Sequence, residues 1–470
     1  MADHPIHIIG GGLAGSEAAW QAASLGTPVV VHEMRPGRQT LVHKTDRLAE
    51  LVCSNSFRGD KLDNAVGLLK EEMRCLGSLV MREADRARVP AGAALAVDRD
   101  AFSLGVTDAI STHPLITVVR EEVARVPDPA SGMFPLIVAT GPLTSDTLAA
   151  DLKTLVGDDD LYFYDAISPI VLAETIDRTK VFRASRWDRS LRSDGAGGTT
   201  AAPAPSGPAC GADAGHGDYL NCPFSRAEYE AFYDALIHAE SATVHDFDRE
   251  KFFEGCLPIE VMAHRGADTL RFGPMKPVGL VDPRSGRTPY AVVQLRQDNL
   301  AGDHFSLVGF QTQLKWSEQA RVLHLIPGLE HAEFARLGMV HRNTYINGPK
   351  VLRATWQTRM RDDLFFAGQI SGVEGYVESA ASGLLAGRNA AAIARGEEPR
   401  VAPRETAIGA LAYYVSHADP RYYQPTNITF GIMPPLELGP RKKVDRKSAQ
   451  AARALRALQE WMHAGTPVVP

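Results

Sequence analysis

The chain has 470 residues, enough for two or three domains with cores of their own, and its 44% hydrophobic and 23% charged residues exclude a disordered or fibrous protein. Its formal net charge of −6 argues against a nucleic-acid partner, although the distribution of charge matters more than the total. Its five scattered cysteines form neither a disulfide framework nor a zinc-ligand pattern. No apolar run is long enough to cross a bilayer, and the first residues lack the regions of a signal peptide. We therefore expect a reduced, cytoplasmic protein with no metal site and no membrane partner.

A glycine motif near the N-terminus predicts a dinucleotide site. A short apolar strand runs directly into Gly10, Gly12 and Gly15, a helix follows, and a second apolar strand ends at Glu33. In such a unit the glycines permit a tight turn, a close approach of the backbone to a pyrophosphate, and close packing of helix on strand. The helix N-terminus offers N–H groups to phosphate, and the acid accepts hydrogen bonds from ribose hydroxyls. The predicted site comprises Gly10, Gly11, Gly12, Leu13, Ala14, Gly15 and Glu33.

The segment that follows this unit holds two cysteines. Residues 35–64 are expected to form a long, partly helical excursion that carries Cys53. Residues 65–87 have the amphipathic spacing of a helix, with Cys75 at helical spacing among leucine and methionine residues. Cys75 is therefore expected to be a core residue.

Two later segments indicate that the dinucleotide is FAD. Residues 134–145 form a strand that ends in an Ala-Thr-Gly turn, which resembles the corresponding turn of FAD-binding Rossmann proteins. Residues 363–394 form a strand, a glycine-rich turn and a long helix, and they resemble the segment with which many flavoproteins close the FAD site. The N-terminus of this helix can stabilise negative charge on a reduced flavin. These segments add Thr140, Gly141, Gly368 and Gln369 to the predicted FAD site.

Between the two FAD segments the pattern changes. From about residue 160 to residue 340 it becomes strand-like and aromatic, which predicts a mixed α+β domain with a Gly/Ala/Pro-rich flexible loop at residues 193–217. We therefore predict an α/β protein in which a FAD-binding Rossmann-type domain is interrupted by an α+β insertion domain. The predicted boundaries are 1–160 for the first part of the FAD domain, 161–340 for the insertion, and 341–470 for the second part with C-terminal helices.

Two cysteines lie in short polar–apolar stretches, Cys53 in LVCSNSF and Cys222 in DYLNCPF. A buried, inert thiol is the commoner fate of a cysteine taken alone. Long collinear stretches of the chain, however, closely resemble the folate- and FAD-dependent tRNA (uracil-5-)-methyltransferases of bacteria. They run through nearly the whole length and include GGGLAGSEAAW, ELVCSNSFRGD, VPAGAALAVDRD, VATGPLTSD, DYLNCPF, FEGCLPIEVMA, DTLRFGPMKPVGL, AVVQLRQDN and FAGQISGVEGYVES.

The resemblance implies an enzyme that forms 5-methyluridine at position 54 in the T loop of tRNA. It implies methylenetetrahydrofolate as carbon donor, bound FAD as reductant and carbon carrier, and NADH or NADPH as the source of reducing equivalents. The two functional cysteines of the family match Cys53 and Cys222. A thiolate that adds to C6 of uracil makes C5 nucleophilic, and a base must then remove the C5 proton. We expect Cys222 to attack C6 and Cys53 to protect the flavin-bound carbon or to handle the C5 proton; the reverse assignment stays open.

If the partner is RNA, two basic stretches are candidates for its binding surface, residues 178–192 and a C-terminal helix. RNA is held mainly through its phosphates, which attract basic side chains. No stable protein partner is expected. Three alternatives stay open: the FAD-dependent enzyme that modifies wobble uridine with a carboxymethylaminomethyl group, a flavin oxidoreductase of small molecules, and a tRNA-binding protein without catalysis. The candidate RNA-binding residues are Arg183, Arg186 and Arg189, and the candidate folate-binding residues are His341 and Asn343.

Overall fold

The computed structural model describes most of the chain: residues 4–40, 42–157, 161–188, 217–241, 257–437, 439–440 and 442–464. For residues 161–166, 340–344 and 443 it describes the backbone alone. Arg189 and the predicted loop 193–217, except Gly217, lie outside the described residues.

The N-terminal and C-terminal parts of the chain share one parallel sheet. Its strand order is β16-β7-β1-β2-β6, and all four pairings are parallel. The strands are short, largely buried apolar runs, which is typical of a sheet covered on both faces. The predicted α/β, Rossmann-type sheet is confirmed. Its strands are β1 (Ile6–Ile9), β2 (Val29–His32), β6 (Ile116–Val119), β7 (Leu136–Val138) and β16 (Leu364–Phe366).

Two helices of this sheet pack directly on each other: α1 (Leu13–Ser24), which follows β1, and α11 (Tyr376–Ala394), which follows β16. A Cβ on Gly383 would lie 2.1 Å from the carbonyl oxygen of Ala14, and one on Gly387 would lie 2.3 Å from that of Ala18. These two glycines are one turn apart on α11, so they let the two helix backbones touch. The contact holds the N-termini of both helices at one cavity, described below.

The predicted helix over residues 65–87 is in fact two helices, because the chain turns at Gly77, whose φ is +74°. The apolar side of the first one, with Leu68 and Met73, faces the core, and its last residue, Cys75, is exposed. The prediction of a core position for Cys75 is therefore wrong. The helices of this part of the chain are α2 (Ala65–Cys75), α3 (Leu79–Arg86), α4 (Arg99–Ser111), α5 (Asp146–Val156), α10 (Gly348–Val351), α12 (Ala407–His417) and α13 (Lys443–His463).

The described residues of 35–64 contain no helix, contrary to the expectation from sequence. They include β3 (Ser56–Gly59), which joins β4 (Arg88–Val89) and β5 (Ala94–Val97) in a three-stranded antiparallel sheet. Pairing with a distant strand overrides the local helical preference here, which is a common reason for such errors.

The central part of the chain forms a second, antiparallel sheet in the order β10-β11-β12-β13-β9-β14. Alternate residues of one strand, Leu220, Cys222 and Phe224, lie in an apolar core with the helices of this lobe. The residues between them belong to the opposite face of the sheet. The elements are β9 (Ile170–Leu172), β10 (Phe182–Ala184), β11 (Tyr219–Phe224), β12 (Ala291–Gln297), β13 (His304–Leu307), β14 (Phe334–Arg336), α6 (Arg226–Ile237), α7 (Ile259–His264), α8 (Thr269–Phe272) and α9 (Trp316–Leu323).

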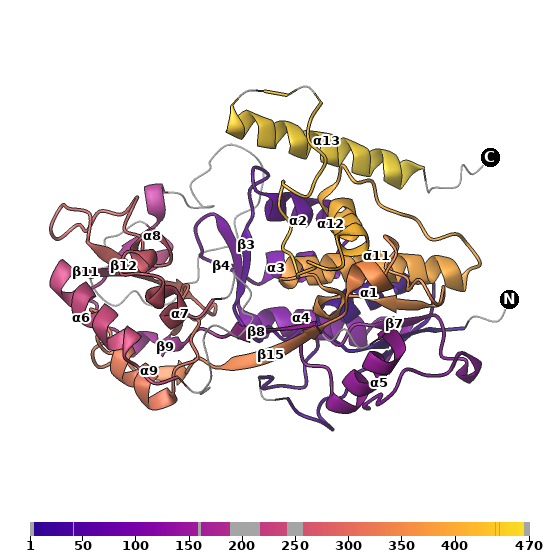
Figure 1. Cartoon of the computed structure of the whole chain (residues 1–470), viewed down its shortest axis with the longest axis horizontal. Coiled ribbons are helices and arrows are strands. Elements are labelled where there is room, and N and C mark those ends of the chain that lie inside the picture. The colour runs from indigo at the N-terminus through magenta and orange to yellow at the C-terminus, as the bar shows by residue number, and fades with distance from the viewer. Residues whose placement is uncertain are drawn as a thin grey trace.

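Two antiparallel strands, β8 (Leu161–Ala166) and β15 (Val340–Tyr345), connect the two lobes. Figure 1 shows them between the lobe with α1 and α11 and the lobe with α6 and α9. They lie at the ends of the predicted insertion, whose boundaries at 161 and 340 stay predictions. In the part of the chain that is described, no helix has both the length and the apolar character needed to span a membrane.

Candidate active site

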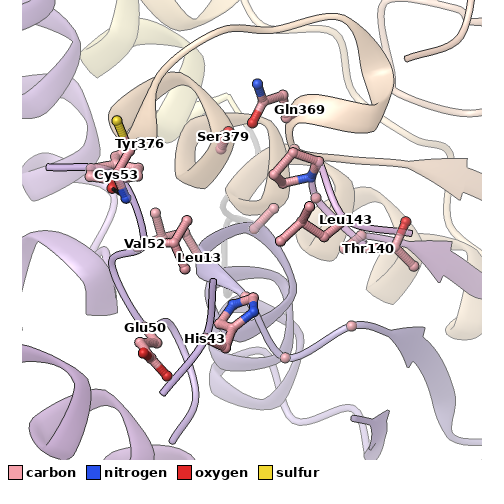
Figure 2. Close-up of a pocket in the computed structure, with 18 of the residues that line it drawn as sticks. Leu13, His43, Glu50, Val52, Cys53, Thr140, Leu143, Gln369, Tyr376 and Ser379 are labelled. Atoms are coloured by element: carbon pink, nitrogen blue, oxygen red, sulfur yellow. Dashed lines mark hydrogen bonds between the residues drawn. The ribbon is translucent and has the colours of Figure 1, made fainter. Parts of the chain in front are cut away.

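A cavity of about 390 Å³ lies where the parallel sheet meets the second lobe. The turns after β1, β2, β7 and β16 line it from one side, and residues of β12 and β13 line it from the other. Figure 2 shows the side chains around it. The structure thus joins segments that are far apart in the sequence. Of the predicted FAD-site residues, those that line the cavity are Gly10, Gly11, Gly12, Leu13, Ala14, Glu33, Thr140, Gly141, Gly368 and Gln369.

Each glycine of the N-terminal motif has its own steric role. Gly10 has a φ of +104°, which L side chains rarely adopt. A Cβ on Gly15 would lie 1.8 Å from the carbonyl oxygen of Gly10, so Gly15 packs the helix against the turn. A Cβ on Gly12 would meet no described protein atom within 4 Å, so Gly12 borders open space at the start of α1. No side chain caps this helix N-terminus and no acid lies in its first turn, which suits a phosphate.

Glu33 follows β2 and is tied to the glycine turn. Its Oε2 accepts from the backbone N–H of Gly11 at 2.9 Å, and its Oε1 accepts from the backbone N–H and the Nε of Arg35 at 3.0 and 2.9 Å. Burial disfavours the charged form, but the hydrogen bonds and the charge of Arg35 outweigh burial and lower the pKa of Glu33. The carboxylate is therefore ionised at the cavity wall, and Oε2 can take a second hydrogen bond from a ribose hydroxyl.

The second helix N-terminus at the cavity belongs to α11. Gly375 precedes this helix and no side chain caps it. Gly368 makes the turn after β16 with a φ of +78°, and the Gln369 amide next to it donates to Glu374 at 2.8 Å. Figure 2 shows this edge of the cavity, with Gln369, Tyr376 and Ser379.

The groups around the cavity fit FAD. The N-termini of α1 and α11 suit a pyrophosphate and an electron-rich flavin ring, and a carboxylate at the end of β2 suits a ribose. The open space at Gly12 lies where a pyrophosphate has to approach the backbone. No group of three or more metal-ligating side chains occurs among the described residues.

Cys53 lines the cavity as well, and its side chain is half-buried. In Figure 2 it lies beside Tyr376, on the opposite side of the view from Thr140. The backbone N–H groups of Cys53 and Ser54 both donate to the Tyr376 hydroxyl oxygen, at 2.8 and 3.0 Å. Burial, together with the charge of Cys53, raises the pKa of Tyr376, so the phenol stays neutral. Tyr376 thereby fixes the Cys53 backbone at the start of α11.

Cys222 is not among the described residues that line this cavity. It lies on β11 with its side chain fully buried in the apolar core of the second lobe. Burial raises the pKa of the Cys222 thiol far above its ordinary value, and the charge of Glu330 acts in the same direction. The structure therefore brings one of the two predicted cysteines to the cavity and keeps the other away from it.

The candidate RNA-binding and folate-binding residues stay predictions. Arg183 lies on β10, and Arg189 lies outside the described residues. Arg186 is half-buried, and its Nε and Nη1 donate to protein acceptors at 2.9 Å each. Burial lowers the pKa of Arg186. His341 and Asn343 lie on β15, where the structure describes the backbone alone.

Several residues that line the cavity escaped the sequence-based prediction. Tyr376 and Arg296 lie inside stretches that carry the family resemblance, GVEGYVES and AVVQLRQDN, and that was the available signal. Spacing alone gives no signal, because these residues come from segments far apart in the chain. The missed lining residues include Arg35, Arg58, Arg296, Ser306, Tyr376 and Asn427.

Comparison with known proteins agrees with this architecture. A family model described as "Glucose inhibited division protein A" matches residues 5–196 and 208–398. Three curated relatives are named methylenetetrahydrofolate--tRNA-(uracil-5-)-methyltransferase TrmFO. The one from Symbiobacterium thermophilum is 56% identical over 100% of both chains. The one from Pelotomaculum thermopropionicum is 54% identical over 98% of this chain and 99% of its own. The one from Enterococcus faecalis is 53% identical over 96% and 97%.

Among solved structures, GidA of Aquifex aeolicus has a similar fold. The TM-score is 0.67 at 17% sequence identity, over 98% of this chain and 74% of that chain. At this identity the likeness concerns the fold alone.

Proposed function

This chain belongs to the family of the folate- and FAD-dependent tRNA (uracil-5-)-methyltransferases, and from that premise we propose that it forms 5-methyluridine in the T loop of tRNA. The carbon donor is methylenetetrahydrofolate, the cofactor is FAD, and NADH or NADPH supplies the reducing equivalents. When bound, FAD would provide the hydride and carry the carbon unit. The main support for this proposal is that Cys53 lines the same cavity as the glycine turns and Glu33 of the predicted FAD site.

Cys53 is proposed to handle the proton at C5 of the uracil. Its thiol lines the cavity, and Tyr376 fixes its backbone at the start of α11. Once C5 has received the carbon, its proton must leave, and a thiolate within reach can accept it. The same position in the cavity also suits a second role for Cys53, which is to protect the carbon unit before its transfer to C5.

Cys222 is proposed to add to C6 of the uracil, as the family resemblance implies. The thiolate is the nucleophile, and the Cys222 thiol is fully buried and held in its neutral form in this structure. The proposal therefore requires that β11 expose this thiol when RNA binds. The target base must also leave its stack and turn into the site.

The tRNA is proposed to be held through its phosphates, with candidate contacts from Arg183, Arg186 and Arg189. Arg186 already donates from Nε and Nη1 to protein acceptors, so its remaining N–H donors would have to make the phosphate contact. His341 and Asn343 are the proposed folate contacts. Since the substrate is tRNA, we place the reaction in the cytoplasm.

The test is to incubate tRNA with the purified protein, FAD, a reductant and isotope-labelled methylenetetrahydrofolate, and to analyse the tRNA fragments by mass. The label is expected in a T-loop uridine, and labelled S-adenosylmethionine should give none. Cys53→Ala should abolish labelling, and the matched variant Cys75→Ala, at the exposed end of α2, should not.

Three outcomes would each contradict the proposal. Label arriving from S-adenosylmethionine would exclude folate as donor. Label in the anticodon fragment would favour the wobble-uridine enzyme. Steady oxidation of the reductant with a small molecule, and no label in RNA, would favour a small-molecule flavin oxidoreductase.

A further inference from the structure

Two arginines hold the backbone on either side of Cys53. Arg99, the first residue of α4, donates from Nη1 to the carbonyl oxygen of Leu51 at 2.7 Å and from Nη2 to that of Cys53 at 3.5 Å. Arg336, the last residue of β14, donates from Nη2 to the carbonyl oxygen of Val52 at 2.6 Å. Arg99 belongs to the lobe with the parallel sheet and Arg336 to the second lobe. Together they form a clamp on residues 51–53 of the Cys53 segment, which comprises residues 51–55.

A third arginine, Arg296 of β12, reaches the same segment from the second lobe. Its Nε donates to Asn55 Oδ1 at 2.8 Å, and its Nη2 donates to Ser54 Oγ at 3.0 Å. The Arg296 side chain lines the cavity and is only 9% exposed. Burying a guanidinium is costly unless hydrogen bonds and a nearby negative charge compensate for the lost hydration. The three side-chain hydrogen bonds of Arg296, to Asn55, Ser54 and Ser306, go to neutral acceptors and supply no negative charge to offset this burial.

The charges around Cys53 do not balance within the described residues. Asp298 forms an ion pair with Arg99 at 3.0 Å, whereas the hydrogen bonds of Arg296 and Arg336 go to neutral acceptors. Tyr376 is neutral. The ion pair of Arg58 with Glu378, in the first turn of α11, carries no net charge. Among the described residues, three guanidiniums and one carboxylate therefore lie around Cys53 outside the Arg58–Glu378 pair.

Each of the three arginines interacts electrostatically with Cys53. Burial lowers the pKa of Arg296 and of Arg336, and the charge of Cys53 opposes this lowering in both cases. For Arg99, burial also opposes the charged form, but Asp298 and Cys53 are among the groups that outweigh it and raise its pKa. Because the interaction of two charges acts equally on both partners, the guanidiniums favour the thiolate form of Cys53.

We propose that Arg99, Arg296 and Arg336 are positioning residues that keep Cys53 as a thiolate, and that two of them make this state depend on the docking of the second lobe. The inference rests on the proposed role of Cys53 as the proton acceptor in the cavity. Only the thiolate form of Cys53 can accept a proton from C5. The three arginines therefore prepare Cys53 for this role before RNA binds.

The test follows alkylation of Cys53 by iodoacetamide in the FAD-bound full chain across a range of pH, with peptide mass analysis. Cys75 is an internal control, because burial and the neighbouring Glu71 and Glu72 raise its pKa. In the wild type, Cys53 should reach half-maximal rate at lower pH than Cys75. Arg296→Gln should move the Cys53 midpoint upward and slow its reaction at neutral pH by about tenfold, since one buried charge is removed.

Two further variants separate charge from geometry. Arg296→Lys keeps the charge but loses the fork to Ser54 and Asn55, and it should retain most of the rate. Arg336→Gln should shift the midpoint in the same direction as Arg296→Gln, and it replaces that variant if the latter does not fold. Arg321→Gln on α9, whose described partners are Glu318 and a backbone carbonyl of α6, should change nothing.

An unchanged Cys53 midpoint in flavin-retaining Arg296→Gln or Arg336→Gln would overturn the proposal. Equal losses in Arg296→Lys and Arg296→Gln would also overturn it, because the contact would then act through geometry rather than charge. Alkylation needs neither tRNA nor folate. A failure here is therefore distinct from a failure of the proposed methyltransferase activity, which the labelling experiment reports.

Discussion

Cys53 lies in a cavity wall beside three guanidiniums, whereas Cys222 lies fully buried in the apolar core of the second lobe. Both come from stretches that resemble the same family, so the sequence gives no hint of this difference. Charge and access decide how a thiol reacts, and both are supplied by residues distant in the chain. We therefore expect Cys53 to react in the structure as it stands, and Cys222 to react only after β11 has exposed its thiol.

The largest expected effect is complete loss of product when either cysteine is replaced. Cys53→Ala and Cys222→Ala should both form no detectable 5-methyluridine, measured by mass analysis of tRNA at matched flavin content. Cys75→Ala, at the exposed end of α2, should stay active. Full activity of Cys222→Ala would contradict the proposed attack at C6, because Cys222 would then be a core residue without a catalytic role.

A second prediction concerns access to the two thiols. Burial raises the pKa of Cys222, so in the free protein at neutral pH its alkylation should be at least about a hundredfold slower than that of Cys53. A raised pKa moves thiolate formation to higher pH, so the Cys222 rate should keep rising well above neutral pH, where that of Cys53 has levelled off. Saturating tRNA should speed the Cys222 reaction. No change with tRNA would argue against the opening of β11.

A third prediction concerns Gly12 and Gly15 of the proposed FAD site. A methyl group at Gly12 meets no described protein atom, so Gly12→Ala should keep the thermal stability of the wild type. It would crowd the pyrophosphate, and overpacking of this kind costs about 1–3 kcal/mol, so the affinity for FAD should fall about tenfold or more. Gly15→Ala, whose methyl group would meet the Gly10 carbonyl, should lose stability as well. Flavin absorbance and thermal unfolding measure the two effects, and wild-type FAD affinity in Gly12→Ala would contradict the proposed site.

The smallest expected effect on product formation comes from removing one hydroxyl. Tyr376→Phe takes the acceptor from the backbone N–H groups of Cys53 and Ser54, and each donor left unsatisfied costs about 1–3 kcal/mol. Amide exchange in residues 51–55 should speed up, and product formation should slow by several-fold. Tyr233→Phe, which loses one hydrogen bond in the second lobe, is the matched control. Equal exchange rates in the two variants would show that Tyr376 does not fix the Cys53 segment.

The FAD-binding half of the fold could be predicted because its signals are local. Gly10, Gly12 and Gly15 sit between a strand and a helix, and their steric roles follow from a few neighbouring residues. The Ala-Thr-Gly turn and the segment around Gly368 carry similar local signals. Gly10, Gly12, the Ala-Thr-Gly turn and Gly368 meet at one cavity because the strands before them share one parallel sheet.

What the sequence could not give depends on long-range packing. The split of residues 65–87 into two helices rests on the turn at Gly77, and it puts Cys75 on the surface. The clamp around Cys53 joins arginines from α4, β12 and β14, which no spacing rule connects. Cys222 points into the core of its lobe because of strand alternation on β11, and a motif match does not reveal that face.

The most direct test of the account is to trap the reacting cysteine with a T-loop RNA that carries 5-fluorouracil. After attack at C6 and carbon transfer, fluorine cannot leave C5 as a cation, so the RNA stays bound to the attacking sulfur. We expect an adduct on Cys222, its persistence in Cys53→Ala, and its absence in Cys222→Ala. Peptide mapping that finds the adduct on Cys53, with none on Cys222, would contradict it and reverse the two roles.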